Sequence, residues 1–400
     1  MALEIVNWLQ DVREHLRVSR RRESLRQPGQ GFDYTEKKYQ NVVRLVVSAI
    51  HPQRMRLRVV EIIQETPTTK TFRCQRSDGP LPPFRPGQYV NLFVDVDGVL
   101  TSRPYSIASA PGSETLELTV RDNPGGFVAP YLLHEIKVGD ELETTGPQGQ
   151  FYHEPLIDGD DLVFLAGGSG ITPLMSIIRD ALQPEHCEQA VLDRATPKIH
   201  LLYGSRVPED VIYGAELAAL AAGHANFRYA PVISEPPPGY KGRSGFLGAD
   251  LIREQIGDAA GKTFYICGPQ AMYDFCLATL RKLGVPSHKI RRELYGPPAD
   301  VTQEPGWPEG LAADTLFEVE VVGQKTVRAP AGEPLLNTLE RYGIVVPAVC
   351  RSGACSACRA RLLSGRVFQP ADTGLRESDR EHGYVHACVS YPLEDLRIRL

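Results

Sequence analysis

The sequence lacks an apolar run long enough to cross a membrane, and its first residues do not follow the pattern of a secretory signal. The best candidate for a membrane span, VVRLVVSAI, is shorter than the roughly 18 residues that a spanning helix needs and is interrupted by Arg44. The opening residues, MALEIVNWLQ, contain no charged segment followed by an apolar core. We therefore expect a cytoplasmic protein without a transmembrane segment, in a compartment where disulfides are rare.

The sequence also lacks a strong excess of either charge. Its 44 Lys and Arg residues against 49 Asp and Glu residues give a formal net charge of −5, so its overall charge does not favour nucleic acid or an anionic membrane as a partner. Residues 1–60 are the exception, with twelve basic and six acidic residues. Apolar residues at helical spacing from Ile5 to Leu16 predict a basic helix there, and a second helix is expected to follow. These helices could dock an acidic protein partner or mediate self-association, and a helical cap over the apolar edge of the neighbouring domain is an equally good interpretation of the apolar stripe.

The length and the pattern of the chain predict several domains. A chain of 400 residues exceeds what one hydrophobic core usually organises. Short β-rich runs separated by Pro and Gly at 53–155 predict an antiparallel barrel or sandwich, and alternating strands and helices at 156–296 predict a parallel α/β domain. A Pro- and Gly-rich linker at 297–314 precedes a compact domain at 315–400. The expected fold class is multidomain α/β and β, with a helical extension at 1–52.

Four of the eight cysteines follow a distinctive spacing. Four residues separate Cys350 from Cys355, two separate Cys355 from Cys358, and twenty-nine separate Cys358 from Cys388. A close triple followed by one distant cysteine is the plant-type spacing of a [2Fe–2S] centre. Gly353 and the small residues around it let the loop wrap closely and point N–H groups at sulfur. The alternative is a structural zinc site, which usually takes two paired knuckles where this chain has one.

The segment RPYSIAS carries the groups that a flavin needs. Arg103 offers a cation to the phosphates, Tyr105 a flat face for stacking, and Ser106 a hydrogen bond near flavin N5; alternate residues of a strand share one face. An Arg and a Tyr on an ordinary strand are the alternative for this motif taken alone.

Two glycine-containing segments follow this strand and strengthen the flavin interpretation. Gly125 and Gly126, followed by Phe127, can present bare backbone N–H groups to a pyrophosphate. The turn GPQGQF ends in an aromatic residue, Phe151. Together with RPYSIAS these segments predict a flavin site.

A second glycine loop, GGSGITP, follows the apolar run DLVFLA. Gly168 and Gly170 belong to a strand–loop–helix arrangement in which free N–H groups and the helix dipole attract a pyrophosphate. Thr172 is expected to cap the helix, with Pro173 at its first position. A lone glycine loop is a weak signal, and its final Pro departs from the G-x-G-x-x-G fingerprint.

Two later segments complete the expected nucleotide site. Ser205 and Arg206 follow a strand and could bind an adenosine 2′-phosphate, although an Arg in a loop is more often simply solvated. Cys267 ends an apolar strand, where a small buried thiol is the ordinary interpretation.

The motifs together resemble two known families. PAVCRSGACSACRARLLSGRV and HACVSYP resemble a plant-type ferredoxin domain, whose fold is a β-grasp. RPYSIAS, PGGFVAPYL and GPQGQF resemble the flavin-binding domain of the ferredoxin–NADP⁺ reductase superfamily, and GGSGITP and YICGPQAM resemble its nucleotide-binding domain. The resemblance implies that the turn Cys267-Gly268-Pro269 lies beside the nicotinamide ring and that Glu293 lies near it. The GPQGQF turn favours FAD over FMN as the flavin.

The resemblance implies one overall function. NADH or NADPH would give a hydride to FAD, and single electrons would pass to the [2Fe–2S] cluster and on to a protein acceptor. The acceptor could belong to an oxygenase, desaturase, hybrid-cluster or corrinoid system. The alternatives are an electron-transfer subunit of a larger complex and a diaphorase acting on a small molecule. The expected catalytic residues are Ser106, Cys267 and Glu293. The choice between NADH and NADPH, the acceptor and the oligomeric state stay open.

Overall fold

The computed structural model describes residues 45–48, 52–123, 126–182, 196–298, 300–371 and 373–400. The chain divides into two compact units, Met1–Pro52 and Gln53–Leu400. Residues 45–48 are helical; the rest of the predicted basic extension before Pro52, and Gly125, lie outside the described residues. No helix in the described part of the chain is long and apolar enough to cross a membrane.

The first sheet of the larger unit is antiparallel and is built from alternating inward and outward side chains. Its six strands run in the order β4-β3-β6-β1-β2-β5. Met55 and Leu57 point into the core, while Arg56 and Arg58, which alternate with them along the strand, are exposed. This is the period-2 pattern of a half-buried strand. A bridge between Ile107 and Leu118 brings the two edges of the sheet together, so the strands close into the expected barrel. The elements are β1 Met55–Thr66, β2 Thr69–Arg76, β3 Tyr89–Val96, β4 Val99–Ser106, β5 Leu116–Arg121, β6 Glu141–Thr144 and the helix α3 Val128–His134.

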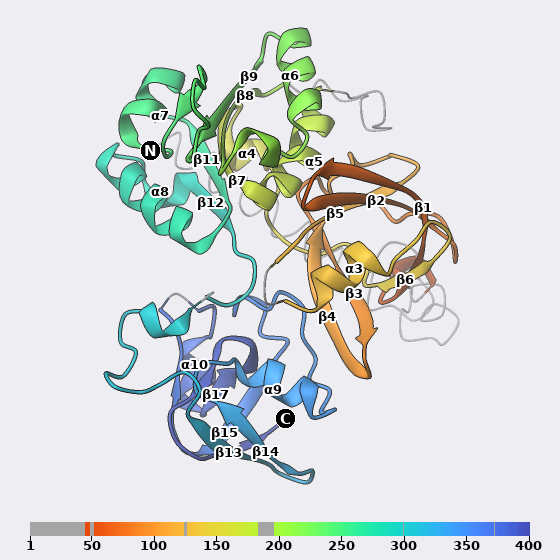
Figure 1. Cartoon of the computed structure of the whole chain (residues 1–400), viewed down its shortest axis with the longest axis vertical. Helices are drawn as coiled ribbons and strands as arrows, with labels where there is room; N and C mark the ends of the chain where they lie inside the picture. The colour runs from red at the N-terminus through yellow and green to blue at the C-terminus, as the bar shows by residue number, and fades with distance from the viewer. Residues whose placement is uncertain (1–44, 49–51, 124–125, 183–195, 299, 372) are drawn as a thin grey trace, which may run out of the picture. The chain divides into compact units, whose positions relative to one another are not determined.

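The second sheet is parallel and has helices on both faces. Its order is β10-β9-β8-β7-β11-β12, and the apolar strands are almost wholly buried, as expected for strands covered on both sides. Figure 1 shows α5 and α6 on one face and α7 and α8 on the other, and the buried cores divide in the same way. The strands are β7 Asp161–Gly167, β8 Lys198–Ser205, β9 Phe227–Ile233, β10 Arg243–Ser244, β11 Thr263–Cys267 and β12 Ile290–Glu293. The helices are α4 Pro155–Asp158, α5 Ile171–Leu182, α6 Gly214–Gly223, α7 Ala249–Ile256 and α8 Gln270–Lys282.

The strand order of this sheet reverses between β7 and β11. The chain moves from β7 outward through β8, β9 and β10, and then returns to place β11 on the other side of β7. Ligands of open parallel sheets bind at such a switch point, beyond the carboxyl ends of the strands. The expected glycine loop follows β7 and the expected nicotinamide turn follows β11, so both lie at this position.

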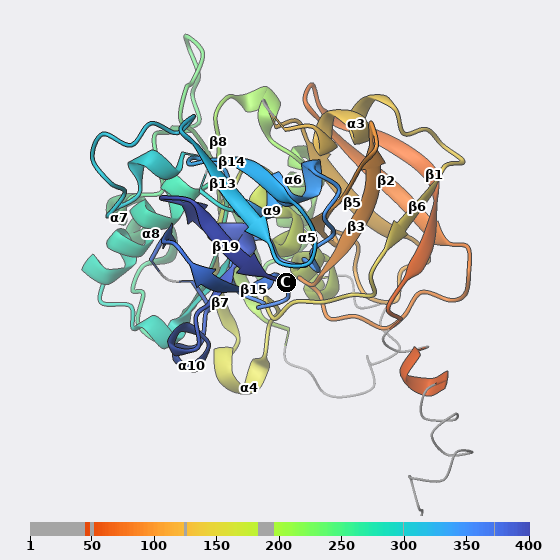
Figure 2. The same cartoon turned by 90° about the horizontal axis from the view of Figure 1, so that it is seen from below.

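The third sheet is mixed and packs against the helix α9, as Figure 2 shows. Its order is β14-β13-β19-β15-β17, with β13 and β19 parallel and the other neighbours antiparallel. This is the β-grasp arrangement that the ferredoxin resemblance implies. Its elements are β13 Leu316–Val321, β14 Thr326–Pro330, α9 Leu335–Arg341, β15 Arg359–Ser364, α10 Glu377–Glu381, β17 Tyr384–His386 and β19 Leu396–Arg399, with a separate pair β16 Val367–Phe368 and β18 Tyr391–Pro392.

The segment predicted as a linker packs against this last pair of strands. Val301 is buried, and the Trp307 ring contacts the Phe368 and Tyr391 rings at centroid distances of 5.3 and 6.3 Å. The predicted domain boundaries stay predictions.

Candidate functional site

The loop after α9 and the turn after β17 bring four thiols together in two pairs. The side chains of Cys350 and Cys355 are in hydrogen-bond contact, as are those of Cys358 and Cys388. The backbone N–H groups of Ser352 and Cys355 donate to the Cys350 sulfur over 3.5 and 3.4 Å. Hydrogen bonds from Cys355 and Ser352 lower the pKa of the Cys350 thiol, so the loop favours a thiolate there. Cys355 is exposed, whereas the other three are buried.

The backbone of this loop adopts conformations that turn its N–H groups toward the sulfurs. Arg351 and Ser356 are left-handed, with φ of 55° and 59°, and Gly353 has φ of 79°. A Cβ on Gly353 would lie 2.8 Å from a methyl group of Val389, so only glycine fits without a shift.

The arrangement of the thiols fits a two-iron centre better than a single ion. In the described part of the chain, no three His, Cys, Asp or Glu side chains are grouped as one metal ion would require. Two separate pairs offer two thiolates to each of two irons, which is the donor set of a four-cysteine [2Fe–2S] centre.

The flavin strand β4 presents a half-buried cation, Arg103, that is not in an ion pair with any described residue. The Arg103 guanidinium donates to the Thr101 hydroxyl over 2.7 Å and to the Ser102 carbonyl over 2.8 Å, and lies 5.5 Å from the Phe127 ring centroid. Burial, and then the nearby Arg351 cation, lower the pKa of Arg103 to about 10. A half-buried cation in this position fits the phosphate of a flavin nucleotide.

The other predicted flavin residues that the structure describes each contact a different part of the chain. Tyr105 packs against the barrel core. Ser106 ends β4, and its hydroxyl oxygen lies 2.6 Å from that of Tyr295. The Gly126 N–H is already bonded to the Asn123 carbonyl over 2.8 Å. Among the predicted flavin residues that the structure describes, Arg103 is therefore the charged group that can bind an anion.

The glycines of the nucleotide loop allow β7 and β11 to meet at their ends. A Cβ on Gly170 would lie 2.1 Å from the Cys267 carbonyl oxygen, and one on Gly167 would lie 2.9 Å from the Pro269 ring. Gly168 is left-handed, with φ of 53°, and its carbonyl accepts from the Tyr203 hydroxyl over 2.8 Å. These positions need glycine because another backbone occupies the space.

One local prediction in this loop was wrong. Thr172 does not cap the helix, since α5 begins at Ile171 and the Thr172 hydroxyl donates to the Ser169 carbonyl over 3.0 Å. The single turn at Gly168–Gly170 leads directly into α5, so the first helical turn has already formed before Thr172. The Thr172 side chain nevertheless faces the candidate site, 3.5 Å from the Tyr295 hydroxyl.

Cys267 lies at the centre of this region and is fully buried. Burial raises the pKa of its thiol well above the usual range, and the side chain hydrogen-bonds to Tyr295 and Tyr273. The Tyr273 hydroxyl also accepts from the Gly268 N–H over 3.2 Å. The thiol is therefore neutral at physiological pH and acts as a small hydrogen-bonding group.

Ser205 and Arg206 lie at the end of β8, as predicted. Ser205 is buried, while Arg206 is exposed and its guanidinium lies 3.8 Å from the Asp210 carboxylate. The same buried carboxylate pairs with Arg121 at 3.2 Å. Arg206 therefore already faces the Asp210 carboxylate. A 2′-phosphate would have to share the Arg206 guanidinium with that carboxylate.

Glu293 connects the nucleotide site with the thiol loop. Burial, and then repulsion from the Cys350 thiolate, raise the pKa of its carboxyl to about 8. Burial raises the pKa of Tyr89 on β3 above its usual range, and the charges of Cys350 and Glu293 raise it further. Tyr89 pairs with Ser106 across β3 and β4, so it is close to the end of the flavin strand as well as to Cys350.

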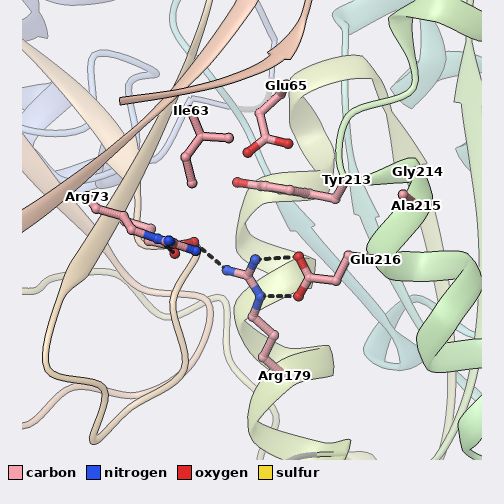
Figure 3. Close-up of a pocket in the computed structure, with 9 residues that line it drawn as sticks. Ile63, Glu65, Arg73, Arg179, Tyr213, Gly214, Ala215 and Glu216 are labelled. Carbon is pink, nitrogen blue, oxygen red and sulfur yellow. Dashed lines mark hydrogen bonds and ion pairs between the residues drawn. The ribbon is translucent and has the colours of Figure 1, made fainter. Parts of the chain in front are cut away.

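A cavity of about 270 Å³ lies elsewhere, between β1, β2 and β5 of the barrel and helices α5 and α6. Figure 3 shows the Arg179 guanidinium in a bidentate ion pair with both carboxylate oxygens of Glu216. The two hydrogen bonds are 2.8 and 2.7 Å long. Arg179 also pairs with Glu117 at 2.6 Å and donates to the Ala108 carbonyl over 2.9 Å. None of the predicted site residues lines this cavity. The network instead connects α5, which follows the glycine loop, with the segment that follows the flavin strand.

Three domain families match the chain in the order that the structure displays. Residues 55–153 match the oxidoreductase FAD-binding domain, residues 164–277 the oxidoreductase NAD-binding domain, and residues 319–393 the 2Fe-2S iron-sulfur cluster binding domain. The last match decides between the two metal interpretations in favour of iron–sulfur.

Several characterised proteins are similar over most of the chain. The glycine betaine monooxygenase reductase subunit of Chromohalobacter salexigens is 30% identical over 365 residues, covering 86% of this chain and 95% of that protein. NADH oxidoreductase HCR of Escherichia coli is 29% identical over 345 residues, covering 85% and 96%. The solved structure of phthalate dioxygenase reductase shares the fold, with a TM-score of 0.64 at 22% identity over 87% of this chain and 98% of that one.

The barrel, the parallel sheet and the thiol loop define a flavin- and nicotinamide-dependent oxidoreductase with an iron–sulfur domain. The chain belongs to the ferredoxin–NADP⁺ reductase superfamily, among the members that carry a C-terminal [2Fe–2S] domain. It passes electrons from NAD(P)H through FAD to the [2Fe–2S] cluster and on to a partner redox protein.

Reasoning from the sequence missed the residues that join these sites. Tyr295 meets Ser106, Thr172 and Cys267, and its only sequence signal was its position two residues after Glu293. Thr101 lies two residues before Arg103, but nothing in the sequence indicated that it contacts the ferredoxin-type domain.

Proposed function

We propose that this chain is the reductase component of a multicomponent oxygenase and that its acceptor is the oxygenase component. The names of its relatives support this proposal: reductase subunits of a glycine betaine monooxygenase, a stachydrine N-demethylase and a 3-ketosteroid-9-alpha-monooxygenase are 25–30% identical over more than four-fifths of the chain. A hybrid-cluster, desaturase or corrinoid acceptor is the other outcome that reconstitution can reveal.

The residues that would hold the cofactors are those that the sequence motifs predict. Arg103 would bind the flavin phosphate, with Tyr105, Gly125, Gly126 and Phe127 around the nucleotide. The proposed nicotinamide and coenzyme ligands are Gly168, Gly170, Thr172, Ser205, Arg206, Cys267, Gly268 and Pro269. The proposed cluster ligands are Cys350, Cys355, Cys358 and Cys388.

The bound cofactors supply the redox chemistry, since FAD accepts a hydride from NAD(P)H and the cluster accepts one electron at a time. The chain's own residues position these groups and exclude water. Ser106 offers a hydroxyl at the end of the flavin strand. Cys267 supplies a neutral, buried hydrogen-bonding group. Glu293, whose pKa lies near 8, can hold or release a proton close to both sites.

One observation carries the proposal: a single short segment links all three predicted sites. Tyr295 contacts Ser106 of the flavin strand and Cys267 of the nicotinamide turn, and Glu293 two residues earlier is electrostatically coupled to Cys350. A chain that only carried electrons would not need a nicotinamide site built against a flavin strand.

The test compares two acceptors with the purified chain, loaded with FAD and iron. Ferricyanide can take electrons from the flavin, whereas cytochrome c reduction is expected to depend on the cluster. In Cys388→Ser, we expect NADH-dependent ferricyanide reduction to persist and cytochrome c reduction to be lost. Product formation after mixing with the oxygenase component encoded nearest to this chain's gene would establish the acceptor; electron flow to that oxygenase in the absence of the cluster would contradict the proposal.

A further inference from the structure

One residue of the flavin barrel and two residues of the domain that carries the thiol loop form one buried polar network. The Thr101 hydroxyl of β4 donates to the Glu340 carboxylate of α9 over 2.9 Å. Arg351 donates to the same hydroxyl over 3.0 Å and forms an ion pair with Glu340. The side chains of Arg351 and Glu340 are only 5% and 7% exposed.

This network is poorly explained as a source of stability. Burying two charges costs desolvation energy that their attraction only partly returns, so apolar residues of similar size would often stabilise such an interface as well. A buried ion pair instead requires one particular alignment of its partners. Here Arg351 bonds to Glu340 on helix α9 of its own domain and to Thr101 on strand β4 of the barrel. These contacts therefore require one particular alignment of the two domains.

Arg351 is itself part of the thiol loop. It directly follows Cys350 and is left-handed, with φ of 55°. A non-glycine residue keeps that conformation only when its surroundings fix it. Its guanidinium is held by Thr101, by Glu340 and by the Asn337 side chain, the last at 3.3 Å. The same contacts therefore fix both the domain alignment and the backbone beside Cys350.

The barrel side of the network is the strand that carries the flavin cation. Arg103 donates to the Thr101 hydroxyl over 2.7 Å, so one oxygen bonds both to the flavin-strand arginine and to the thiol-loop arginine. A second contact runs parallel to the first: the Asn91 amide donates to the Ala348 carbonyl over 2.9 Å and to the Ser102 hydroxyl over 3.0 Å. Strands β3 and β4 therefore contact the thiol loop at two points, Ala348 and Arg351.

We propose that Thr101 and Glu340 are positioning residues that hold the thiol loop against the flavin strand through Arg351, and thereby set the geometry for electron transfer from flavin to cluster. This inference rests on the proposed function, because it needs a flavin on β4 and a cluster in the loop. One electron leaves the flavin and enters the cluster in this step, and no bond between protein and cofactor is made or broken. Electron transfer slows as the distance between donor and acceptor grows, so contacts that hold the loop against the strand affect its rate.

The test uses the full-length chain loaded with FAD and iron, and compares Thr101→Val with Thr101→Ser. Valine matches threonine in shape but removes the hydroxyl, whereas serine keeps it. We expect Thr101→Val to lower cytochrome c reduction per bound FAD at least about tenfold, since small misplacements have large kinetic costs. Ferricyanide reduction should stay within about twofold, and Thr101→Ser should behave like the parent chain.

A second readout does not depend on turnover. Hydrogen exchange of the backbone amides at residues 349–353 should accelerate in Thr101→Val and in Glu340→Gln, because the loop loses the contacts that fix it. Two matched control variants change residues of the domain that carries Glu340, at contacts made within that domain. Thr338→Val removes a hydroxyl that donates to Glu333, and Glu333→Gln removes an ion pair with Arg341. Neither control should change exchange in the loop or the ratio of the two acceptor rates.

The outcomes separate this inference from the proposed function. If cytochrome c reduction by the parent chain does not require Cys388, the proposed function fails. If it does require Cys388 but Thr101→Val keeps the parent's acceptor ratio and loop exchange, the positioning role is wrong. Should Glu340→Gln fail to fold, the comparison of Val with Ser at position 101 still decides.

Discussion

Ser106 at the end of β4 and Tyr295 just beyond β12 are 189 residues apart in the sequence, yet their hydroxyl oxygens lie 2.6 Å apart. The same tyrosine lies against Thr172 and Cys267. It therefore fills the space that the flavin strand, the glycine loop and the nicotinamide turn share. A nicotinamide ring that reaches the flavin has to displace the Tyr295 side chain or share this space with it.

We expect Tyr295→Ala to bind NAD⁺ more tightly, because the coenzyme no longer competes with a built-in aromatic ring. A side chain that must leave before binding reduces the apparent affinity by the population of the open state. The expected fall in Kd is at least about fivefold, equivalent to about 1 kcal/mol. Calorimetric titration of the FAD-loaded chain measures it. Tyr295→Phe keeps the ring and should show a smaller change; an unchanged or larger Kd in Tyr295→Ala would mean that the ring does not occupy the binding position.

Gly170→Ala should destabilise the nucleotide-binding domain. Its new methyl group would lie 2.1 Å from the Cys267 carbonyl oxygen, so the ends of β7 and β11 would have to separate. Overpacking of this kind typically costs about 1–3 kcal/mol of folding free energy. Gly223→Ala is the matched control: the position ends α6 with no other atom within 4 Å, and alanine there should leave stability unchanged or raise it by up to about 1 kcal/mol. Thermal and urea denaturation would measure both, and equal stability of the two variants would contradict this account of Gly170.

His200 should make the fold sensitive to acid. Its side chain on β8 is 2% exposed, and burial lowers its pKa from 6.5 to about 4. The nearest carboxylate, that of Asp161 at 3.7 Å, is already bonded to Lys262 at 2.5 Å. Because the folded state disfavours the charged imidazole, the unfolded chain binds more protons between these two pKa values. Stability is therefore complete above about pH 6.5 and is lost as the pH falls toward 4.

The expected loss from this group is about 2 kcal/mol between pH 7 and pH 5. Urea denaturation at both pH values would show it, and His200→Gln should reduce the difference by that amount. The exposed His288→Gln is the control and should leave the difference unchanged. The same pH dependence in His200→Gln as in the parent would remove His200 as the cause.

Arg206→Ala should discriminate between the two coenzymes. If Arg206 binds the 2′-phosphate, its loss should lower kcat/KM for NADPH at least about tenfold, the value of one charge-assisted hydrogen bond. NADH has no such group and should change little. Arg228→Ala, an exposed arginine on β9 of the same sheet, controls for a general loss of positive charge. Equal effects on NADH and NADPH would show that Arg206 serves Asp210 rather than the coenzyme.

The local motifs could be read from the sequence because each depends on residues that are close along the chain. The spacing of Cys350, Cys355 and Cys358 gives a loop that can surround iron, whatever follows it. The run GGSGITP predicted a strand–loop–helix unit, and the structure has β7, a single turn and α5 in that order. Fold class and cofactors were predictable for the same reason, since each domain carries its own pattern.

The contacts between domains could not be predicted, because residues such as Thr101, Glu340 and Arg351 become neighbours only when separate domains pack. Threonine on a strand and glutamate on a helix are ordinary in isolation, and their pairing depends on burial across an interface. The same holds for Tyr295, whose sequence position says nothing about Ser106. The sequence by itself thus indicated the classes of cofactor, a flavin, a nicotinamide coenzyme and an iron–sulfur cluster, and the order of the domains, but not the choice between NADH and NADPH. Only the tertiary structure decided how those sites are joined, because the joining contacts are long-range and the cost of removing their polar groups from water is offset only where folding brings the partners together.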